Sequence, residues 1–178
     1  IGIDLEYIFV DDGSQDKTLE VLRNLGKDKK EVRYLSFSRN FGKESAMLAG
    51  LYAAKGQYVV IMDADLQHPP SLLLEMKKRL DANPNLDCVG ARRLNRKGEP
   101  IVRSFLSNLF YRIVNKMSSV EIQDNAGDYR MMKRNMVDSI LEVSEYNRFS
   151  KGIFSWVGYR TDYVDYENVE RVAGTTKW

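Results

Sequence analysis

The hydrophobic and polar residues of this chain follow a repeating pattern in its first half. Short apolar runs that end in Asp or Gly alternate with longer segments whose apolar residues recur at helical spacing. The runs are typical of buried strands, and the spaced segments are typical of helices. The pattern predicts strands within residues 5–14, 32–38, 57–65 and 86–92, and helices from 14 or 16 to about 25, from 43 to 55 and from 72 to 80.

The second half of the chain is less regular. We expect an amphipathic helix at 101–117, a shorter helix at 136–143 and a last strand at 163–166. Strands that alternate with helices of about ten to fifteen residues indicate an α/β fold, in which a mostly parallel sheet carries helices on both faces. Because no internal repeat or linker interrupts the pattern, residues 1–178 are expected to form a single domain.

Composition places the chain among ordinary globular proteins, with 43% hydrophobic and 29% charged residues. A formal net charge of +2 gives no sign of nucleic-acid binding. The single cysteine, Cys88, lies in an apolar run, which predicts a small buried core residue. No run approaches the about 20 apolar residues of a membrane span, and no signal peptide is expected in residues 1–178. Because the chain starts at Ile1 without Met and ends at Trp178, we expect a fragment of a longer protein.

Acidic side chains follow two of the predicted strands, at Asp11-Asp12 and at Asp63-Ala64-Asp65. In open parallel α/β sheets, ligands bind at the carboxyl ends of the strands. Because side chains alternate along an extended segment, Asp63, Asp65 and Gln67 can project to one side. Such oxygen donors suit Mg²⁺ or Mn²⁺, which keeps positions open for phosphate oxygens. The simpler alternative is that the acids only cap turns and helix starts.

Two kinds of site fit acids in these places. Phosphoacceptor receiver domains of bacterial response regulators also have paired acids after the first strand and another acid after a later one. That family further requires Ser or Thr at the end of the next strand and a downstream Lys. Here Gly90-Ala91-Arg92-Arg93 ends that strand, and no matching Lys is evident, which weighs against a receiver. The second kind of site belongs to nucleotide-sugar transferases.

Three segments carry a specific resemblance: "VDDGSQDKT", "SRNFGKESAMLAGLYAAKGQYVVIMDADLQHPP" and "NAGDYRMMKR". In this order they resemble the inverting GT-A glycosyltransferases of family 2, and most of all its polyprenyl-phosphate sugar transferases, such as dolichol-phosphate mannose synthase and bactoprenol glucosyltransferases. The resemblance covers nearly the whole chain and implies a Rossmann-like GT-A fold. The family's first strand, with its Pro-x-Tyr-Asn-Glu-like end, is missing here, as are the transmembrane helices that often follow in relatives.

The resemblance implies a donor site. Asp63-Ala64-Asp65 matches the family's DxD motif, so Asp65 and Gln67 would bind Mg²⁺ or Mn²⁺, and Asp63 would contact the metal or the ribose side of the nucleotide. A cation there would offset the charge that develops on a departing nucleoside diphosphate. The other residues that match the nucleotide-sugar pocket are Asp11 and Asp12, which would face the nucleobase, together with Arg39, Asn40 and Lys43.

The catalytic acids implied by the resemblance are Asp63, Asp65 and Asp128. A hydroxyl nucleophile needs a carboxylate base, whereas a phosphate oxygen is already anionic near pH 7. Asp128 is therefore expected to orient the acceptor or a cationic neighbour. His68, the only histidine, is expected to be a hydrogen-bonded turn residue that takes no part in catalysis.

Basic residues crowd the segment from 92 to 116, where seven stand against the single acid Glu99: Arg92, Arg93, Arg96, Lys97, Arg103, Arg112 and Lys116. A solvated charge run is the alternative explanation. The family's acceptor is a lipid monophosphate, and the resemblance aligns Arg92, Arg103 and Ser107 with its ligands, with Arg93 and Arg96 as alternatives to Arg92. It also places Arg130 near the active site. Arg103 and Ser107 are four residues apart, so on a helix they share a face and could hold one phosphate.

The resemblance as a whole implies a metal-dependent, inverting hexosyltransferase. The expected donor is UDP-glucose, with UDP-N-acetylglucosamine or GDP-mannose as alternatives, and the expected acceptor is undecaprenyl or dolichyl phosphate. The domain would work at the cytoplasmic face of a membrane, with Arg148, Trp156 and Lys177-Trp178 close to the lipid. Helix 101–117 could rest on the membrane surface or face the core, and self-association of the chain stays open. The other candidates are transfer to a saccharide hydroxyl, although no Gln-x-x-Arg-Trp motif is present, and a non-catalytic binding domain.

Overall fold

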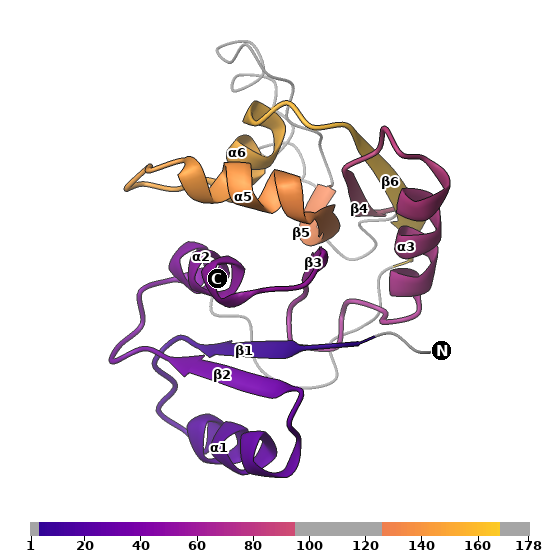
Figure 1. The fold of residues 1–178 in the computed structure, drawn as a ribbon. Coiled ribbons are helices and arrows are strands. Elements are labelled where there is room, and N and C mark those ends of the chain that lie inside the picture. Colours follow the sequence, from indigo (N-terminus) through magenta and orange to yellow (C-terminus); the bar gives the residue numbers. More distant parts are fainter. Residues whose placement is uncertain (1–3, 95–125, 168–178) are drawn as a thin grey trace.

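The computed structural model describes residues 4–94 and 126–167, and Figure 1 shows their fold. In chain order the elements are β1 (Tyr7–Asp11), α1 (Thr18–Asp28), β2 (Val32–Ser36), α2 (Lys43–Ala53), β3 (Tyr58–Ile61), α3 (Leu72–Ala82), β4 (Cys88–Arg93), β5 (Ala126–Lys133), α5 (Arg134–Glu142), α6 (Ser150–Trp156) and β6 (Thr161–Tyr166).

The described strands form two hydrogen-bonded sheets. β1 and β2 pair in parallel, and the other four strands form a sheet in the order β3-β5-β4-β6. β5 runs antiparallel to both of its neighbours, whereas β4 and β6 are parallel, so β3, β4 and β6 point the same way. The expected α/β class is therefore confirmed; the described strands form two sheets, and β5 runs against its two neighbours in the larger one.

Helices cover both faces of the four-stranded sheet (Figure 1). α3 packs on one face through Met76 and Leu80, and α5 and α6 pack on the other. The alternation of side chains along β5 supplies both cores, because Met131 faces α3 while Met132 faces α5. Cys88 in β4 is fully buried, which confirms its expected core position.

Two described elements were not expected from the sequence, β5 and α6. β5 carries polar residues on the face where Asp128 and Arg130 lie, so no continuous apolar run marks it. α6 has only seven residues, including Gly152, too few to show a helical period. The expected strand at 163–166 begins earlier, at Thr161, and the expected helix at 136–143 begins at Arg134. The expected helix at 101–117 lies outside the described residues.

Candidate active site

The antiparallel course of β5 brings Asp128 beside the acids that follow β3. Ile61, the last residue of β3, lies opposite Arg130 of β5. Because the two strands run in opposite directions, Asp63 beyond the end of β3 lies level with Asp128. Two of the three acids expected to be catalytic are therefore neighbours in space, although they are far apart in the sequence.

Lys43, the first residue of α2, connects these two acids. Its Nζ lies 2.9 Å from Asp63 Oδ1 and 2.8 Å from Asp128 Oδ2. The side chain of Asp128 is 15% exposed, whereas that of Lys43 is 50% exposed. The cluster therefore joins one largely buried carboxylate and one more accessible carboxylate through a shared cation.

The pKa values of this cluster are displaced. Burial favours the neutral acid, but the charge and hydrogen bond of Lys43 outweigh it and hold the pKa of Asp128 below its usual value. Burial likewise opposes the charge of Lys43, yet Asp128 and Asp63 together raise the pKa of that lysine. Asp128 is thus ionised at neutral pH and is a weak proton acceptor. The sequence analysis expected Asp128 to orient the acceptor or a cationic neighbour, and Lys43 is such a neighbour.

Residues 63–68, which we name the DxD turn, leave β3 and double back before α3. Leu66 has a φ of 63°, an uncommon value for a residue with a side chain. The backbone N–H of Gln67 donates to Asp65 Oδ1 over 3.1 Å, which closes a local turn around Leu66. Asp65 and Gln67, the expected metal ligands, thus lie on either side of this strained residue.

His68 ends the DxD turn inside the protein. It is 5% exposed, and its Nδ1 accepts the backbone N–H of Asp63 over 3.0 Å. Burial lowers the pKa of His68, so the ring is neutral near pH 7. The expectation of a hydrogen-bonded turn histidine is confirmed.

Tyr129 supports the DxD turn from β5, and the sequence analysis did not single it out. Its ring stacks on that of His68 with centroids 4.7 Å apart, and its hydroxyl donates to the carbonyl of Pro69 over 2.8 Å. Burial raises its pKa to about 12, so the hydroxyl keeps its proton. The available signal was its place between Asp128 and Arg130 in the quoted "NAGDYRMMKR" segment.

Asp11 and Asp12, at the end of β1, both accept hydrogen bonds from the protein. Asp11 is 4% exposed and accepts the Ser14 N–H and the Ser36 hydroxyl. The Ser14 side chain contributes most to holding the pKa of Asp11 below its usual value. Asp12 accepts the backbone N–H groups of Phe41 and Gly42, over 2.7 and 2.9 Å. These bonds fix the segment before α2 and hence the position of Lys43. That either acid faces a nucleobase stays a prediction.

The loops after β1 and β2 touch at Gly13. A Cβ atom at this position would lie 2.4 Å from the carbonyl carbon of Arg39 and 2.7 Å from the amide nitrogen of Asn40, and the φ of Gly13 is +71°. Only glycine fits this close approach. The guanidinium of Arg39 lies over the ring of Phe41, 4.5 Å from its centroid. Arg39 is thus held beside α2, and its expected contact with the donor stays a prediction.

Arg92 and Arg93 end β4 and point to opposite faces of the sheet. Arg92 forms a two-pronged ion pair with Asp165 of β6, with distances of 2.7 and 3.1 Å. Arg93 donates to the hydroxyl of Tyr166 over 3.0 Å, on the side of His68. No sequence pattern predicts the contact between Asp165 and Arg92. A phosphate ligand at Arg92 would have to share its guanidinium with this carboxylate.

Arg130 lies next to Asp128 on the same face of β5, where it is 4% exposed. Its guanidinium lies 3.7 Å from the ring centroid of Phe154, and Nη2 donates to the carbonyl of Gly127. Its buried Nε has no hydrogen-bond partner within the described segments. Contact with an acceptor phosphate stays a prediction for Arg130. Arg103 and Ser107, the other expected acceptor ligands, lie outside the described residues.

No three side chains of His, Cys, Asp or Glu converge as a metal cage in residues 4–94 and 126–167. A magnesium-type site does not require such a cage, because the ion usually takes one or two carboxylates and completes its shell with waters and substrate phosphates. The carboxylate of Asp63 already faces a cation, since both of its oxygens lie 2.9 Å from Lys43 Nζ. Carboxylate and amide oxygens are the ligand types that such an ion takes, and the binding of a divalent ion by Asp63, Asp65 and Gln67 stays a prediction.

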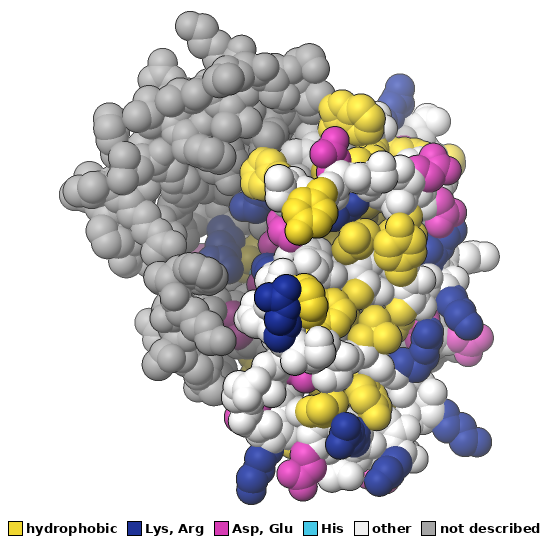
Figure 2. All heavy atoms as spheres, turned by 90° about the vertical axis from the view of Figure 1, so that its left-hand side faces the viewer, with side chains coloured by type: hydrophobic (Ala, Val, Ile, Leu, Met, Phe, Trp, Pro, Cys, Tyr) yellow, Lys and Arg dark blue, Asp and Glu magenta, His cyan; other side chains and the backbone are white. Residues whose placement is uncertain are grey.

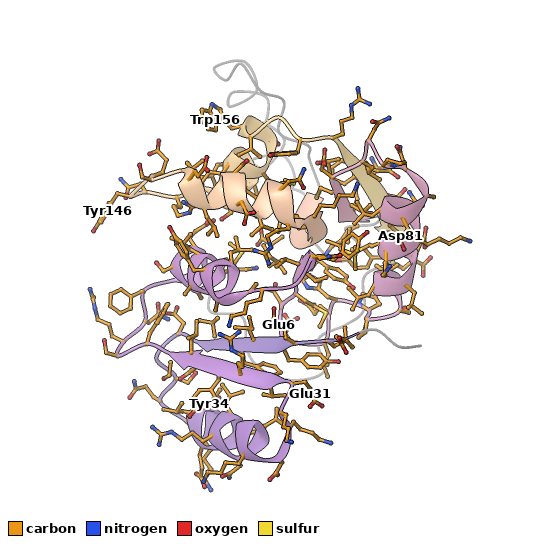
Figure 3. All side chains as sticks on the ribbon, in the orientation of Figure 1. Glu6, Glu31, Tyr34, Asp81, Tyr146 and Trp156 are labelled. Atoms are coloured by element: carbon orange, nitrogen blue, oxygen red, sulfur yellow. The ribbon has the colours of Figure 1, made fainter. Side chains whose placement is uncertain are left out.

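Large aromatic side chains are exposed at the end of the molecule formed by α5 and α6. Tyr146 is 97% exposed and Trp156 is 64% exposed, and Figure 3 shows both pointing away from the body of the protein. Figure 2, which faces the left-hand side of Figure 1, shows hydrophobic side chains scattered among charged ones. Arg148 instead turns toward α5 and donates to the carbonyls of Val143 and Ile140. Within the described ranges, no helix has both the length and the apolarity to cross a membrane.

Comparison with known proteins gives relatives along the whole chain. A Bacillus subtilis protein named as a glycosyltransferase is 48% identical over 178 residues, which are 100% of this chain and 53% of the relative. The bactoprenol glucosyl transferase of Shigella phage SfV is 40% identical over 175 residues, 98% of this chain and 56% of the relative. A prophage bactoprenol glucosyl transferase homologue of Escherichia coli is 39% identical over a segment of the same length. The chain thus spans about half the length of these relatives.

Solved structures share the fold at low sequence identity. A mannosyltransferase from Pyrobaculum calidifontis, in complex with GDP-mannose and Mn²⁺, aligns with a TM-score of 0.58 at 23% identity, over 95% of this chain and 48% of the other. Glucosyl-3-phosphoglycerate synthase from Mycobacterium tuberculosis, in complex with Mn²⁺, UDP and glucosyl-3-phosphoglycerate, aligns with a TM-score of 0.55 at 19% identity, over 96% and 62%. This likeness confirms the expected GT-A fold. Residues 2–141 match the sequence profile described as Glycosyl transferase family 2, and the chain therefore belongs to that family.

Proposed function

We propose that this domain transfers glucose, with inversion, from UDP-glucose to a polyprenyl phosphate. The observation that carries the proposal is the cluster of Asp63, Lys43 and Asp128 beside the DxD turn, since it joins acids and a cation where a nucleoside diphosphate would leave. The relatives named bactoprenol glucosyl transferases, about 40% identical over nearly the whole chain, support the choice of glucose and of a lipid phosphate.

A divalent cation, Mg²⁺ or Mn²⁺, would be held by Asp65 and Gln67, with Asp63 as a further ligand. When bound, it offsets the charge that develops on the departing diphosphate. Lys43 stands beside Asp63 and adds a fixed positive charge near the same point. Asp11 and Asp12 keep the loops around the donor in place through their bonds to Ser36 and Gly42.

The acceptor phosphate needs no general base. An anionic phosphate oxygen attacks the anomeric carbon, the bond from that carbon to the diphosphate breaks, and its electron pair leaves with UDP. The lowered pKa of Asp128 supports this scheme, because an acid that is paired with Lys43 is a poor proton acceptor at neutral pH. Asp128 would instead hold Lys43 and orient the acceptor. Transfer to a saccharide hydroxyl would require a stronger base at this position.

The acceptor would approach from the side of the basic segment, with Arg92, Arg103, Ser107 and Arg130 as phosphate ligands. The exposed Tyr146 and Trp156 support contact with a membrane surface, since aromatic rings with a polar edge favour the interface between lipid and water. We place the domain at the cytoplasmic face of the membrane, where nucleotide sugars are made.

The test is a transfer assay with the full-length protein, undecaprenyl phosphate and radiolabelled UDP-glucose, UDP-N-acetylglucosamine or GDP-mannose. We expect a chloroform-soluble labelled product from UDP-glucose that requires Mg²⁺ or Mn²⁺. Label on a water-soluble saccharide would point to the hydroxyl-transfer alternative. Absence of lipid-linked product with every donor, from protein that still binds UDP, would overturn the proposal.

A further inference from the structure

We propose that His68 and Tyr129 are positioning residues that set the backbone of the DxD turn for metal binding, an inference that rests on the proposed function. Neither side chain is expected to touch substrate. The pair holds both ends of the turn: His68 Nδ1 accepts the N–H of Asp63 at its start, and the Tyr129 hydroxyl donates to the carbonyl of Pro69 just after its end.

The two rings act as one support. They stack with centroids 4.7 Å apart and planes inclined by 16°, and both are buried against α3 and the sheet. Tyr129 belongs to β5 and follows Asp128 directly, next to Arg130, which lies opposite Ile61 of β3 and Gly90 of β4. The turn is thus tied to the same strand that carries Asp128.

The DxD turn needs such support because its own conformation is unfavourable. Leu66 adopts a positive φ, which a side chain disfavours, and it is 63% exposed, so packing does little to hold it. The bond from Gln67 N–H to Asp65 closes only the middle of the turn. Without the contacts at Asp63 and Pro69, the expected metal ligands Asp65 and Gln67 would populate other turn conformations. The affinity for the metal would fall because a smaller fraction of molecules would have the conformation that binds it.

The contacts suggest a set of matched variants. His68→Phe keeps a flat ring on Tyr129 but removes the acceptor for the Asp63 N–H, whereas His68→Asn restores an acceptor without the stacked ring. Tyr129→Phe keeps the ring and removes only the bond to Pro69. Tyr159→Phe is the control, since its hydroxyl bonds Ser139 and the carbonyl of Asn135 beside α5.

The measurement is the affinity of the full-length protein for Mn²⁺ in the presence of UDP, followed by electron paramagnetic resonance, together with urea unfolding of each variant. Loss of an outer partner of a metal ligand commonly weakens binding about 10- to 100-fold. We expect a loss in this range for His68→Phe, recovery of most of it in His68→Asn, a smaller loss for Tyr129→Phe and none for Tyr159→Phe.

Comparing Mn²⁺ affinity with the free energy of unfolding for each variant separates a role in metal binding from a role in stability. Wild-type Mn²⁺ affinity in His68→Phe and Tyr129→Phe, whatever their unfolding free energy, would overturn the inference and leave the pair as core residues only. If His68→Phe does not fold, Tyr129→Phe decides: a weakened Mn²⁺ affinity supports the inference, and wild-type affinity overturns it. Because Mn²⁺ and UDP binding is read without any acceptor, failure to transfer glucose would count against the proposed function and not against this role.

Discussion

Replacing Lys43 with Met removes the cation that Asp63 and Asp128 share, and its cost can be worked from the geometry. Two contacts of 2.9 and 2.8 Å to carboxylates are lost, and Asp128 stays largely buried without its partner. A hydrogen bond to a charged group contributes about 1.5–3 kcal/mol, and the half-exposed position of Lys43 reduces the sum through solvent screening. We therefore expect Lys43→Met to lower the free energy of unfolding by about 2 kcal/mol near pH 7.

The pH dependence of that loss has a definite sign. The native pKa of Asp128 is depressed, so its contribution is complete above the ordinary value of 3.8 and disappears as the pH falls through the lowered native value. The pKa of Lys43 is raised above 10.5, so its contribution disappears only as the pH rises beyond that value. Between these limits, the difference between wild type and Lys43→Met should stay constant.

Urea unfolding followed by tryptophan fluorescence, at several pH values from about 5 to about 9, measures this difference. Lys77→Met is the matched control, because the Lys77–Asp81 pair is shorter, at 2.6 Å, but its carboxylate is 47% exposed, whereas that of Asp128 is 15% exposed. The control should change stability by no more than the error of measurement. Equal effects of the two substitutions, or a difference that varies strongly within this pH range, would refute the reasoning.

Three further predictions concern activity and membrane contact. Asp65→Ala should lower the transfer rate by about a hundredfold or more and the unfolding free energy by no more than about 1 kcal/mol, the contribution of its bond to the Gln67 N–H; an active Asp65→Ala enzyme would remove it from the metal site. Arg103→Ala should raise the KM for the lipid acceptor by about tenfold and leave the KM for the donor nearly constant, whereas equal effects on both would end its assignment to the acceptor phosphate. Trp156→Ser should reduce co-sedimentation of the protein with phosphatidylethanolamine and phosphatidylglycerol vesicles. The control Tyr34→Ser, at the opposite end of the molecule in Figure 3, should leave co-sedimentation unchanged. Equal binding by both variants would contradict a lipid contact at Trp156.

The elements that sequence patterns predicted are those with uninterrupted apolar runs or clear helical spacing. β1, β2 and β3 fall inside the expected strands, β4 extends one residue beyond its expected end, and α1, α2 and α3 follow the expected helices closely. β5 was not predicted because Asp128 and Arg130 precede Met132 on one of its faces and interrupt the apolar pattern there. A strand that carries candidate site residues does not show the regular apolar pattern of a strand whose residues serve burial alone.

The candidate site was predictable as a set of residues but not as a set of contacts. Resemblance pointed to Asp63, Asp128 and Lys43, yet their meeting depends on the register between β3 and β5, which no local pattern encodes. The opposite directions of Arg92 and Arg93 follow from strand alternation, but the Asp165 partner comes from β6. His68 could be placed at a turn from the sequence, whereas its stacking on Tyr129 required the fold.

The most direct test of the central claim is mass spectrometry of the lipid formed by the full-length protein from UDP-glucose and undecaprenyl phosphate. We expect a species heavier than the acceptor by one hexosyl residue. Its fragmentation should release a hexose phosphate, and its anomeric configuration should be opposite to that of the donor. Unchanged undecaprenyl phosphate alongside consumed UDP-glucose, or a product with retained configuration, would contradict it.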